Sequence, residues 1–467
     1  EYAQDNMNIL RVAMADPQDL DAMDDISIIT GCQVEPVVAT PRSVMLAIDH
    51  FFGQDEVASA LEIYTQSVKD VKEEDAFSED INSSPIVMLV KEMIEKAARQ
   101  RASDIHIEPM EKVVRIRYRI DGVLYEKAKY DVKVMAALSA RVKIIGGMDI
   151  SEKRKPQDGR ITQVVDRVEY DIRVSVLPTV YGEKIVMRLA VKTALNREKS
   201  QLGLKPNEMK QFDHILKNPH GILLVTGPTG SGKSTTLYTA LSELNTEAVN
   251  IITVEDPVEA NIDGINQIQV NPKANLTFAS ALRSILRQDP DIIMIGEIRD
   301  GETAGIAVQA SITGHLVVST LHTNSSASTI TRLEDMGVEP YLIADSIVGV
   351  IAQRLVRRLC PECKKPRMAN AEELEILGAE PGEKVQVYEP CGCSKCDHMG
   401  YKGRIGVYEI MEMTPALKRI ISKEGTVEEI KDQAMKEGMH TLRMSAAEYV
   451  RQGITSVAEM VKVSFDS

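Results

Sequence analysis

The stretch GPTGSGKS at residues 227–234 constrains the fold of this chain more than any other feature. It matches the phosphate-binding loop G-x-x-x-x-G-K-[S/T] at every fixed position, so Lys233 and the Ser234 hydroxyl are expected to meet nucleotide phosphates and Mg²⁺. An apolar run precedes the loop and a helical pattern follows it, and a helix N-terminus favours anions. The predicted nucleotide contacts are Gly227, Pro228, Thr229, Gly230, Ser231, Gly232, Lys233, Ser234 and Thr235.

Four short apolar runs are spaced through residues 202–356, and helical patterns lie between them. None of the four alternates with polar residues, which is typical of strands buried on both faces. We therefore expect an α/β fold with a doubly wound parallel sheet. Ligands bind such sheets beyond the carboxyl ends of the strands. The runs are residues 222–225, 251–254, 292–295 and 316–319.

Acidic residues and a histidine follow three of these runs. Glu255, Asp256 and Glu259 follow the second run, and clustered carboxylates beside phosphates can hold Mg²⁺ through water or orient an attacking water. Glu297 follows the third run in a segment that resembles a Walker-B strand, and we expect it to serve the metal through a water. His322 follows the fourth run and is expected to sense the γ-phosphate. A polar turn and a strand-end cap are the structural alternatives for the acids.

Arg283 and Arg287 are four residues apart in a helical pattern, so they share one helix face. In that position they can neutralise the charge of a phosphoryl-transfer transition state. Ion pairing on the protein surface is the alternative for both.

Five of the six cysteines fall between residues 360 and 396, and four of them form two C-x-x-C pairs. Four thiolates in two such knuckles suit Zn²⁺ in a closed, structural site. Cys391 offers a competing ligand, but Cys393 completes a knuckle with Cys396 and is preferred. The predicted zinc ligands are Cys360, Cys363, Cys393 and Cys396.

Composition shifts divide the chain into parts. Acidic residues with few large apolar groups indicate a linker, and period-two segments beside a helical pattern indicate an α+β domain. A helix is expected over residues 44–52. The expected parts are a partial N-terminal α/β module (1–55), an acidic linker (56–84), a second N-terminal α+β domain (85–195), the nucleotide domain (202–356), a zinc-binding module (357–403) and a C-terminal helical domain (404–467).

The charge of the 467-residue chain argues for protein partners. Its formal net charge is −14 and it contains no Trp, so neither a general attraction to nucleic acid nor a base-stacking platform is expected. No apolar run approaches the roughly 18 residues that span a bilayer. Nucleotide use and the clustered thiols favour the cytoplasm.

Several further motifs occur in the order that one known family uses. The chain resembles, over residues 85–467, the secretion ATPases that drive type IV pilus assembly and type II secretion. The motifs are RASDIHIE (101–108), KPQDGR (155–160), the phosphate loop, an aspartate box (252–259), the Walker-B segment (289–300), a histidine box (313–324) and the cysteine module with GYKGR (400–404).

This resemblance implies a RecA-like core, a PAS-like second domain and a homohexameric ring with ATP between neighbouring subunits. It places Arg173 and Arg188 of the second domain in the nucleotide cleft, together with the arginine pair described above. It also makes Glu259 the candidate general base, supported by Glu255 and Asp256.

The resemblance further implies a cytoplasmic enzyme, peripheral to the inner membrane, whose partners are an inner-membrane platform protein and a cytoplasmic adaptor. Retraction ATPases of the superfamily lack the cysteine module, so the cysteines point to extension or secretion. From the same resemblance we expect the part of the N-terminal domain that binds a cyclic dinucleotide in some relatives to be truncated in this sequence. A nucleotide-gated scaffold without useful turnover and a RecA-like nucleic-acid translocase are the alternative functions.

Overall fold

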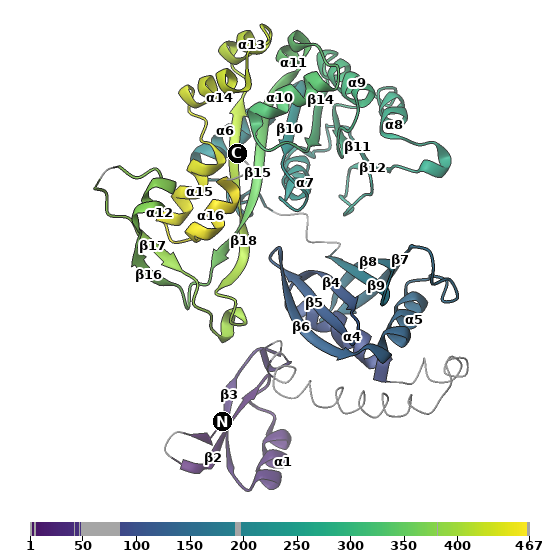
Figure 1. Cartoon of the computed structure of the whole chain (residues 1–467), viewed down its shortest axis with the longest axis vertical. Coiled ribbons are helices and arrows are strands. Elements are labelled where there is room, and N and C mark those ends of the chain that lie inside the picture. The colour runs from purple at the N-terminus through teal and green to yellow at the C-terminus, as the bar shows by residue number, and fades with distance from the viewer. Residues whose placement is uncertain are drawn as a thin grey trace. The chain divides into compact units, whose positions relative to one another are not determined.

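The computed structural model describes residues 2–3, 6–41, 43–45, 47, 85–191, 198–380 and 382–464. The chain divides into two compact units, Glu1–Ala190 and Val191–Ser467 (Figure 1). The expected acidic linker lies outside the described residues, as does part of the helix expected over residues 44–52.

The N-terminal module of the first unit is a small α/β element, as expected. It contains β1 (Tyr2–Ala3), β2 (Asn6–Met14), α1 (Leu20–Thr30) and β3 (Gln33–Val38). Strands β2 and β3 are parallel, and β1 pairs antiparallel with β2. The Asp19 side chain accepts the Ala22 amide and begins α1, and Gly31 ends it with a φ of 68° that favours glycine.

A six-stranded sheet with two α-helices forms the described residues 85–190 of the first unit. Its strand order is β6-β5-β4-β9-β8-β7. Residues alternate between a buried face and a charged face: on β5, Ile116 and Tyr118 are buried, whereas Arg115 and Arg117 lie on the opposite face. The elements are α4 (Pro85–Arg99), β4 (Ala102–Pro109), β5 (Val113–Ile120), β6 (Val123–Asp131), α5 (Met135–Ile145), β7 (Gln157–Val165), β8 (Val168–Thr179) and β9 (Gly182–Val191).

The second unit is built on a seven-stranded sheet, and the expected parallel α/β fold is confirmed. The strand order is β12-β11-β13-β14-β10-β15-β18, with every pair parallel except β15 and β18. The four apolar runs are strands β10, β11, β13 and β14. The strands are β10 (Gly221–Thr226), β11 (Ile251–Glu255), β12 (Asn266–Gln269), β13 (Ile292–Ile295), β14 (Leu316–Leu321), β15 (Ile347–Leu359) and β18 (Tyr401–Glu412).

Helices cover both faces of this sheet. On β10, Ile222 and Leu224 point into one hydrophobic cluster with α8 to α11, while Leu223 and Val225 point into a second cluster with α6 and α7. Each fully buried aliphatic side chain of this kind contributes about 1.5–3 kcal/mol. The helices are α6 (Pro206–Leu216), α7 (Lys233–Leu244), α8 (Phe278–Ile285), α9 (Gly301–Ile312), α10 (Ser326–Asp335) and α11 (Pro340–Ser346).

Strands β15 and β18 run side by side beyond the sheet to the cysteine module (Figure 1). Both strands cross the predicted boundaries of the zinc-binding module, at 356/357 and 403/404. The module is therefore continuous with two strands of the core sheet. The expected helical C-terminus follows β18. The elements are β16 (Lys365–Met368), α12 (Ala371–Ile376), β17 (Gln386–Glu389), α13 (Pro415–Ile421), α14 (Val427–Lys436), α15 (Leu442–Arg451) and α16 (Val457–Ser464).

Short 3₁₀ helices lie at η2 (Val132–Val134), η3 (Lys199–Gln201), η4 (Pro272–Ala274) and η5 (Ser394–Cys396). Within the described ranges, no helix combines the length and the apolar character needed to cross a membrane.

Candidate nucleotide-binding site

The phosphate loop connects β10 to α7 and has the backbone that its glycines predict. Gly230 and Gly232 have φ values of 81° and 92°, in the region that favours glycine. A Cβ on Gly232 would lie 2.8 Å from the Gln353 side-chain nitrogen, and one on Gly227 would lie 2.5 Å from the Gln353 carbonyl oxygen. The loop is therefore a tight cradle backed by β15, a shape that fits a phosphate chain.

Lys233 is held inside this loop. Its ammonium group donates to the carbonyl oxygens of Gly227, at 2.6 Å, and Pro228, at 3.2 Å. The pKa of Lys233 is lowered to about 8, chiefly by burial and also by the charge of Arg354, although the charges of Glu297 and Glu259 act to raise it. A phosphate bound at the loop would place negative charge beside this ammonium group and would favour its charged form.

Glu297 is the centre of a charged group at the ends of β13 and β14. His322 Nε2 lies 3.3 Å from Glu297 Oε2, and Arg299 contacts the other oxygen of the same carboxylate. Arg299 also lies 3.7 Å from Asp256. The structure thus brings together three of the predicted site residues, and it adds Arg299, which the sequence analysis missed. The sequence signal for Arg299 was its position two residues after Glu297, the acid expected to bind the metal through a water.

Glu255 differs from the other predicted acids because it is buried, with 4% of its surface exposed. Its carboxylate accepts hydrogen bonds from Thr253 Oγ1 at 2.7 Å, from Gln267 Nε2 at 3.1 Å and from the Tyr238 hydroxyl. These donors occupy both oxygens. Glu255 therefore faces the protein interior, while Glu259, four residues later, is exposed.

Arg283 and Arg287 make contacts on the surface of the second unit. Arg283 pairs with Glu302 of α9, and Arg287 Nη1 donates to the Arg283 carbonyl at 2.8 Å. The alternative of surface ion pairing thus describes the contact of Arg283, whereas Arg287 donates to a backbone carbonyl. The predicted role of both at the phosphates stays a prediction.

Arg173 and Arg188 lie in the first unit, on β8 and β9. Arg188 Nε lies 3.0 Å from Oδ1 of the buried Asp104, and Arg173 Nε lies 4.0 Å from Oδ2 of the buried Asp171. A buried carboxylate thus lies near the Nε atom of each arginine. Their predicted place in the nucleotide cleft stays a prediction.

The four predicted zinc ligands converge at the end of the β15–β18 ribbon. Their sulfur atoms all lie within 4.8 Å of one another, and Cys360–Cys393 and Cys363–Cys396 are 3.9 and 3.8 Å apart. The Gly400 amide donates to Cys396 Sγ at 3.3 Å. Four sulfurs with a backbone donor fit a tetrahedral zinc site.

Cys391 lies outside this cluster, so the preference for Cys393 agrees with the geometry. Cys391 is exposed, and its thiol is directed to the Glu389 carbonyl at 3.9 Å.

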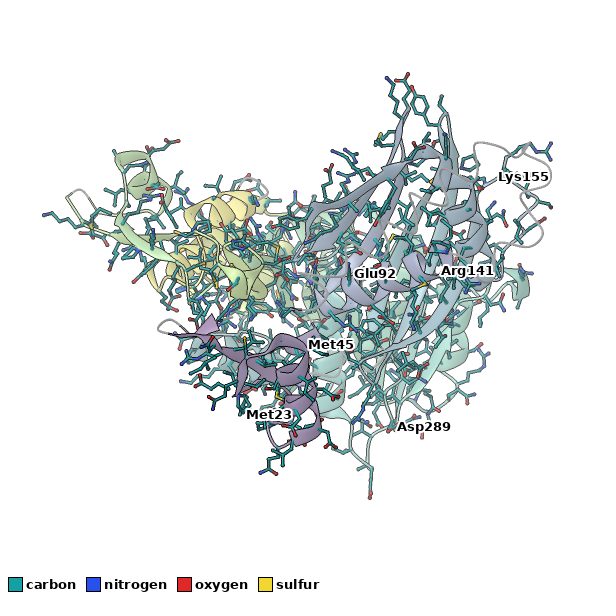
Figure 2. All side chains as sticks on the ribbon, turned by 90° about the horizontal axis from the view of Figure 1, so that it is seen from below. Met23, Met45, Glu92, Arg141, Lys155 and Asp289 are labelled. Atoms are coloured by element: carbon teal, nitrogen blue, oxygen red, sulfur yellow. The ribbon has the colours of Figure 1, made fainter. Side chains whose placement is uncertain are left out.

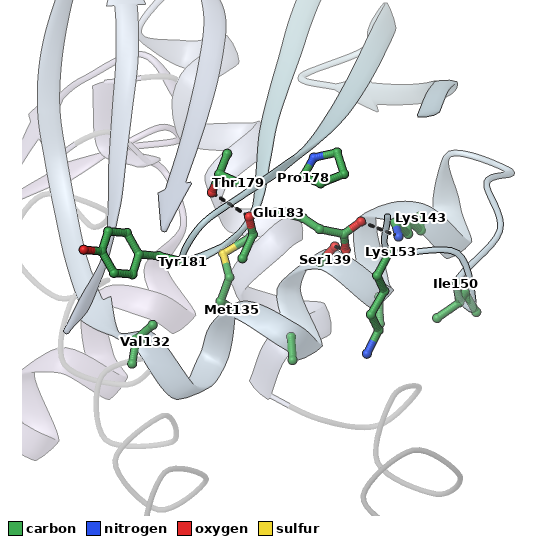
Figure 3. Close-up of a pocket in the computed structure, with 13 residues that line it drawn as sticks. Val132, Met135, Ser139, Lys143, Ile150, Lys153, Pro178, Thr179, Tyr181 and Glu183 are labelled. Atoms are coloured by element: carbon green, nitrogen blue, oxygen red, sulfur yellow. Dashed lines mark hydrogen bonds and ion pairs between the residues drawn. The ribbon is translucent and has the colours of Figure 1, made fainter. Parts of the chain in front are cut away.

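The first unit contains a separate pocket of about 290 Å³ between α5 and the β8–β9 turn (Figure 3). Lys143 is buried beneath it and lies 2.6 Å from Glu183, which also accepts from Ser139 at 2.5 Å. Lys143 further donates to the Glu152 carbonyl at 2.8 Å. The buried charges of Lys143 and Glu183 are therefore paired with one another.

Two of the motifs that suggested a family begin at the surface. Lys155, which opens KPQDGR, and Asp289, which opens the Walker-B segment, are both exposed and extend outward from the ribbon (Figure 2).

Comparison with protein families gives two matches. The model described as "Type II/IV secretion system protein" matches residues 79–462, and the "MshEN domain" model matches residues 3–58.

Curated relatives of two kinds are similar to this chain. The type IV pilus assembly ATPase PilB of Myxococcus xanthus is 45% identical over 465 residues, which cover 97% of this chain and 82% of the relative. The type II secretion system ATPase E of Vibrio cholerae is 49% identical over 389 residues, which cover 83% of this chain and 77% of the relative.

Solved structures share the fold. The ATPase DotB of Legionella pneumophila superposes with a TM-score of 0.60 at 23% identity, covering 81% of this chain and 96% of that one. The pilus retraction motor PilT, solved with bound ADP, superposes with a TM-score of 0.53 at 25% identity and covers the same shares of both chains. These neighbours bear out the RecA-like core.

Proposed function

Because the chain belongs to the type II/IV secretion system protein family, we propose that it is an ATPase that drives assembly of a type IV pilus or of a type II secretion pseudopilus. Relatives of both kinds match it at similar identity, so the proposal covers both machines. The proposal extends to a homohexamer at the inner face of the cell membrane. Its partners there are a platform protein and an adaptor.

One observation carries the proposed activity: Lys233 is buried in the phosphate loop, and Glu297, which follows β13 in the same sheet, contacts His322, which follows β14. An anion-binding loop and an acid at the same edge of the sheet are parts that nucleotide hydrolysis needs. Mg²⁺, when bound, supplies charge neutralisation between the phosphates, and Ser234 and Glu297 are the residues that would hold it.

The other side chains have distinct tasks in this proposal. Glu259 accepts a proton from the attacking water at its exposed carboxylate. The four predicted arginines, Arg173, Arg188, Arg283 and Arg287, stabilise negative charge on the leaving phosphates. The zinc site fixes the ribbon that joins the core sheet to the C-terminal helices.

Turnover and assembly of the purified full chain test this proposal together. With Mg²⁺ and ATP we expect phosphate release, and with a non-hydrolysable analogue we expect light scattering to give the mass of six chains. A chain that hydrolyses ATP but stays monomeric would remove the ring. A chain that binds ATP without turnover would favour the nucleotide-gated scaffold, and strong stimulation by DNA would favour the translocase.

A further inference from the structure

The Tyr238 hydroxyl connects the helix that begins in the phosphate loop to the segment that carries Glu259. Tyr238 lies on α7 and has 2% of its surface exposed. Its hydroxyl donates to Glu255 Oε2 and accepts the backbone N–H of Glu259 at 3.3 Å. One buried oxygen atom thus contacts both ends of the Glu255–Glu259 turn.

A second side chain fixes the same segment from the other side. Gln267 on β12 donates to Glu255 at 3.1 Å and to the Ala260 carbonyl at 3.0 Å, and its oxygen accepts the Ile262 amide at 2.8 Å. The backbone after β11 is therefore held both to α7 and to β12. Because the Glu259 side chain is exposed, the position of its carboxylate depends on where this backbone is held.

We propose that Tyr238 is a positioning residue for Glu259, and this rests on the proposed role of Glu259 as general base. Tyr238 follows the phosphate loop on the same helix, so it transmits the position of the loop to the acid that orients water. Loss of the hydroxyl would leave the Glu259 amide without this acceptor and Glu255 without one donor. A displacement of about 1 Å in a catalytic group can cost up to about 10²-fold in rate.

The first test is Tyr238→Phe in the full chain, which removes only the hydroxyl. We expect kcat for ATP hydrolysis to fall about tenfold with KM changed less than about twofold, because the phosphate contacts are retained. Tyr408→Phe is the matched control: Tyr408 is equally buried, and its hydroxyl donates to the Leu202 carbonyl at 2.9 Å. We expect the control to keep the wild-type kcat.

A double-mutant cycle separates positioning from a general structural effect. In the Glu259→Gln background, Tyr238→Phe should cause no further loss, because its effect passes through Glu259. A wild-type kcat in Tyr238→Phe, or an equal loss in both backgrounds, would overturn the proposal.

A second variant covers the case in which Tyr238→Phe does not fold. Gln267→Met removes the other support from a partly exposed position, and we expect about a threefold fall in kcat with KM unchanged. An unchanged kcat in this variant would count against the network. If Glu259→Gln alone keeps full turnover, the proposed role of Glu259 fails. If Glu259→Gln is inactive and both supporting variants are fully active, only the positioning proposal fails.

Discussion

His322 Nε2 lies 3.3 Å from Glu297 Oε2, and this contact joins the end of β14 to the end of β13 beside the phosphate loop. The pair therefore belongs to one charged group, although the two residues come from separate motifs. Its position at the carboxyl ends of parallel strands is the place where such folds bind ligands.

Replacing Glu297 with Gln should lower kcat by about 10²-fold or more, because the variant loses the charge proposed to serve Mg²⁺. Nucleotide binding without metal should be kept, since Lys233 and the loop amides remain. A turnover assay and a binding titration with an ATP analogue measure the two effects. Glu247→Gln, at an exposed position on the same unit, is the control. Normal turnover in Glu297→Gln would contradict the proposed metal role.

The affinity for nucleotide should fall above pH 8. The pKa of Lys233 is lowered to about 8, chiefly by burial, so the free protein loses this charge as the pH rises through that value. Bound phosphate favours the charged form, so binding above pH 8 takes up a proton. Between pH 7.5 and pH 9 we expect the Kd for an ATP analogue to rise roughly eightfold.

Lys233→Arg supplies the control for this pH dependence. A guanidinium stays charged throughout the range, so the Kd of the variant should be flat with pH whatever its absolute value. A flat wild-type profile, or the same slope in the variant, would show that Lys233 does not titrate near pH 8.

The cysteine cluster should hold one zinc ion per chain. Cys360→Ser and Cys396→Ser should lose the metal and open residues 360–400 to proteolysis, because the remaining sulfurs cannot complete a tetrahedral site. Cys391→Ser should keep the metal, since Cys391 lies outside the cluster. Metal analysis of the purified chains measures all three. Absence of zinc in the wild type, or its loss from Cys391→Ser, would contradict the assignment.

Glu108 should make the first unit sensitive to acid. Its burial acts to raise the pKa, but hydrogen bonding and charge from Arg117 and Lys184 outweigh this and lower the pKa to about 2. The folded pKa lies below the unfolded value of 4.5, so the stabilisation is complete above pH 4.5 and is lost as the pH falls toward 2. We expect about 1–3 kcal/mol in total, since the cations are partly exposed.

Calorimetry between pH 6 and pH 3 tests this prediction. The melting temperature of Glu108→Gln should be lower than that of the wild type at pH 6 and should fall less steeply with acid. Glu111→Gln, at an exposed position, should follow the wild-type slope. An equal slope in all three proteins would show that Glu108 does not contribute.

The core strands could be predicted because burial on both faces leaves uninterrupted apolar runs, such as residues 292–295 in β13. Strands β15 and β18 were missed for the opposite reason. Both are long and extend beyond the sheet, so they carry polar residues such as Arg357, which stacks on Tyr401 at 3.9 Å. A run that contains such polar residues does not show the uninterrupted apolar pattern that predicts a core strand.

Those residues of the candidate site that belong to sequence motifs could be predicted. The phosphate loop, Glu297 and His322 follow strand ends, and sequence spacing places them at one edge of the sheet. Tyr238 and Gln267 could not be found in this way. Their contacts with Glu255 join α7 and β12 to the end of β11, and nothing local in the sequence marks those tertiary contacts.

Phosphate release by the purified full chain, compared with Lys233→Ala, tests the central claim most directly. We predict Mg²⁺-dependent release by the wild type, none above background from Lys233→Ala, and wild-type release from Lys217→Ala, which alters an exposed lysine on the same unit. Equal release from the wild type and Lys233→Ala in a clean preparation would contradict the claim that this loop is the site of ATP hydrolysis.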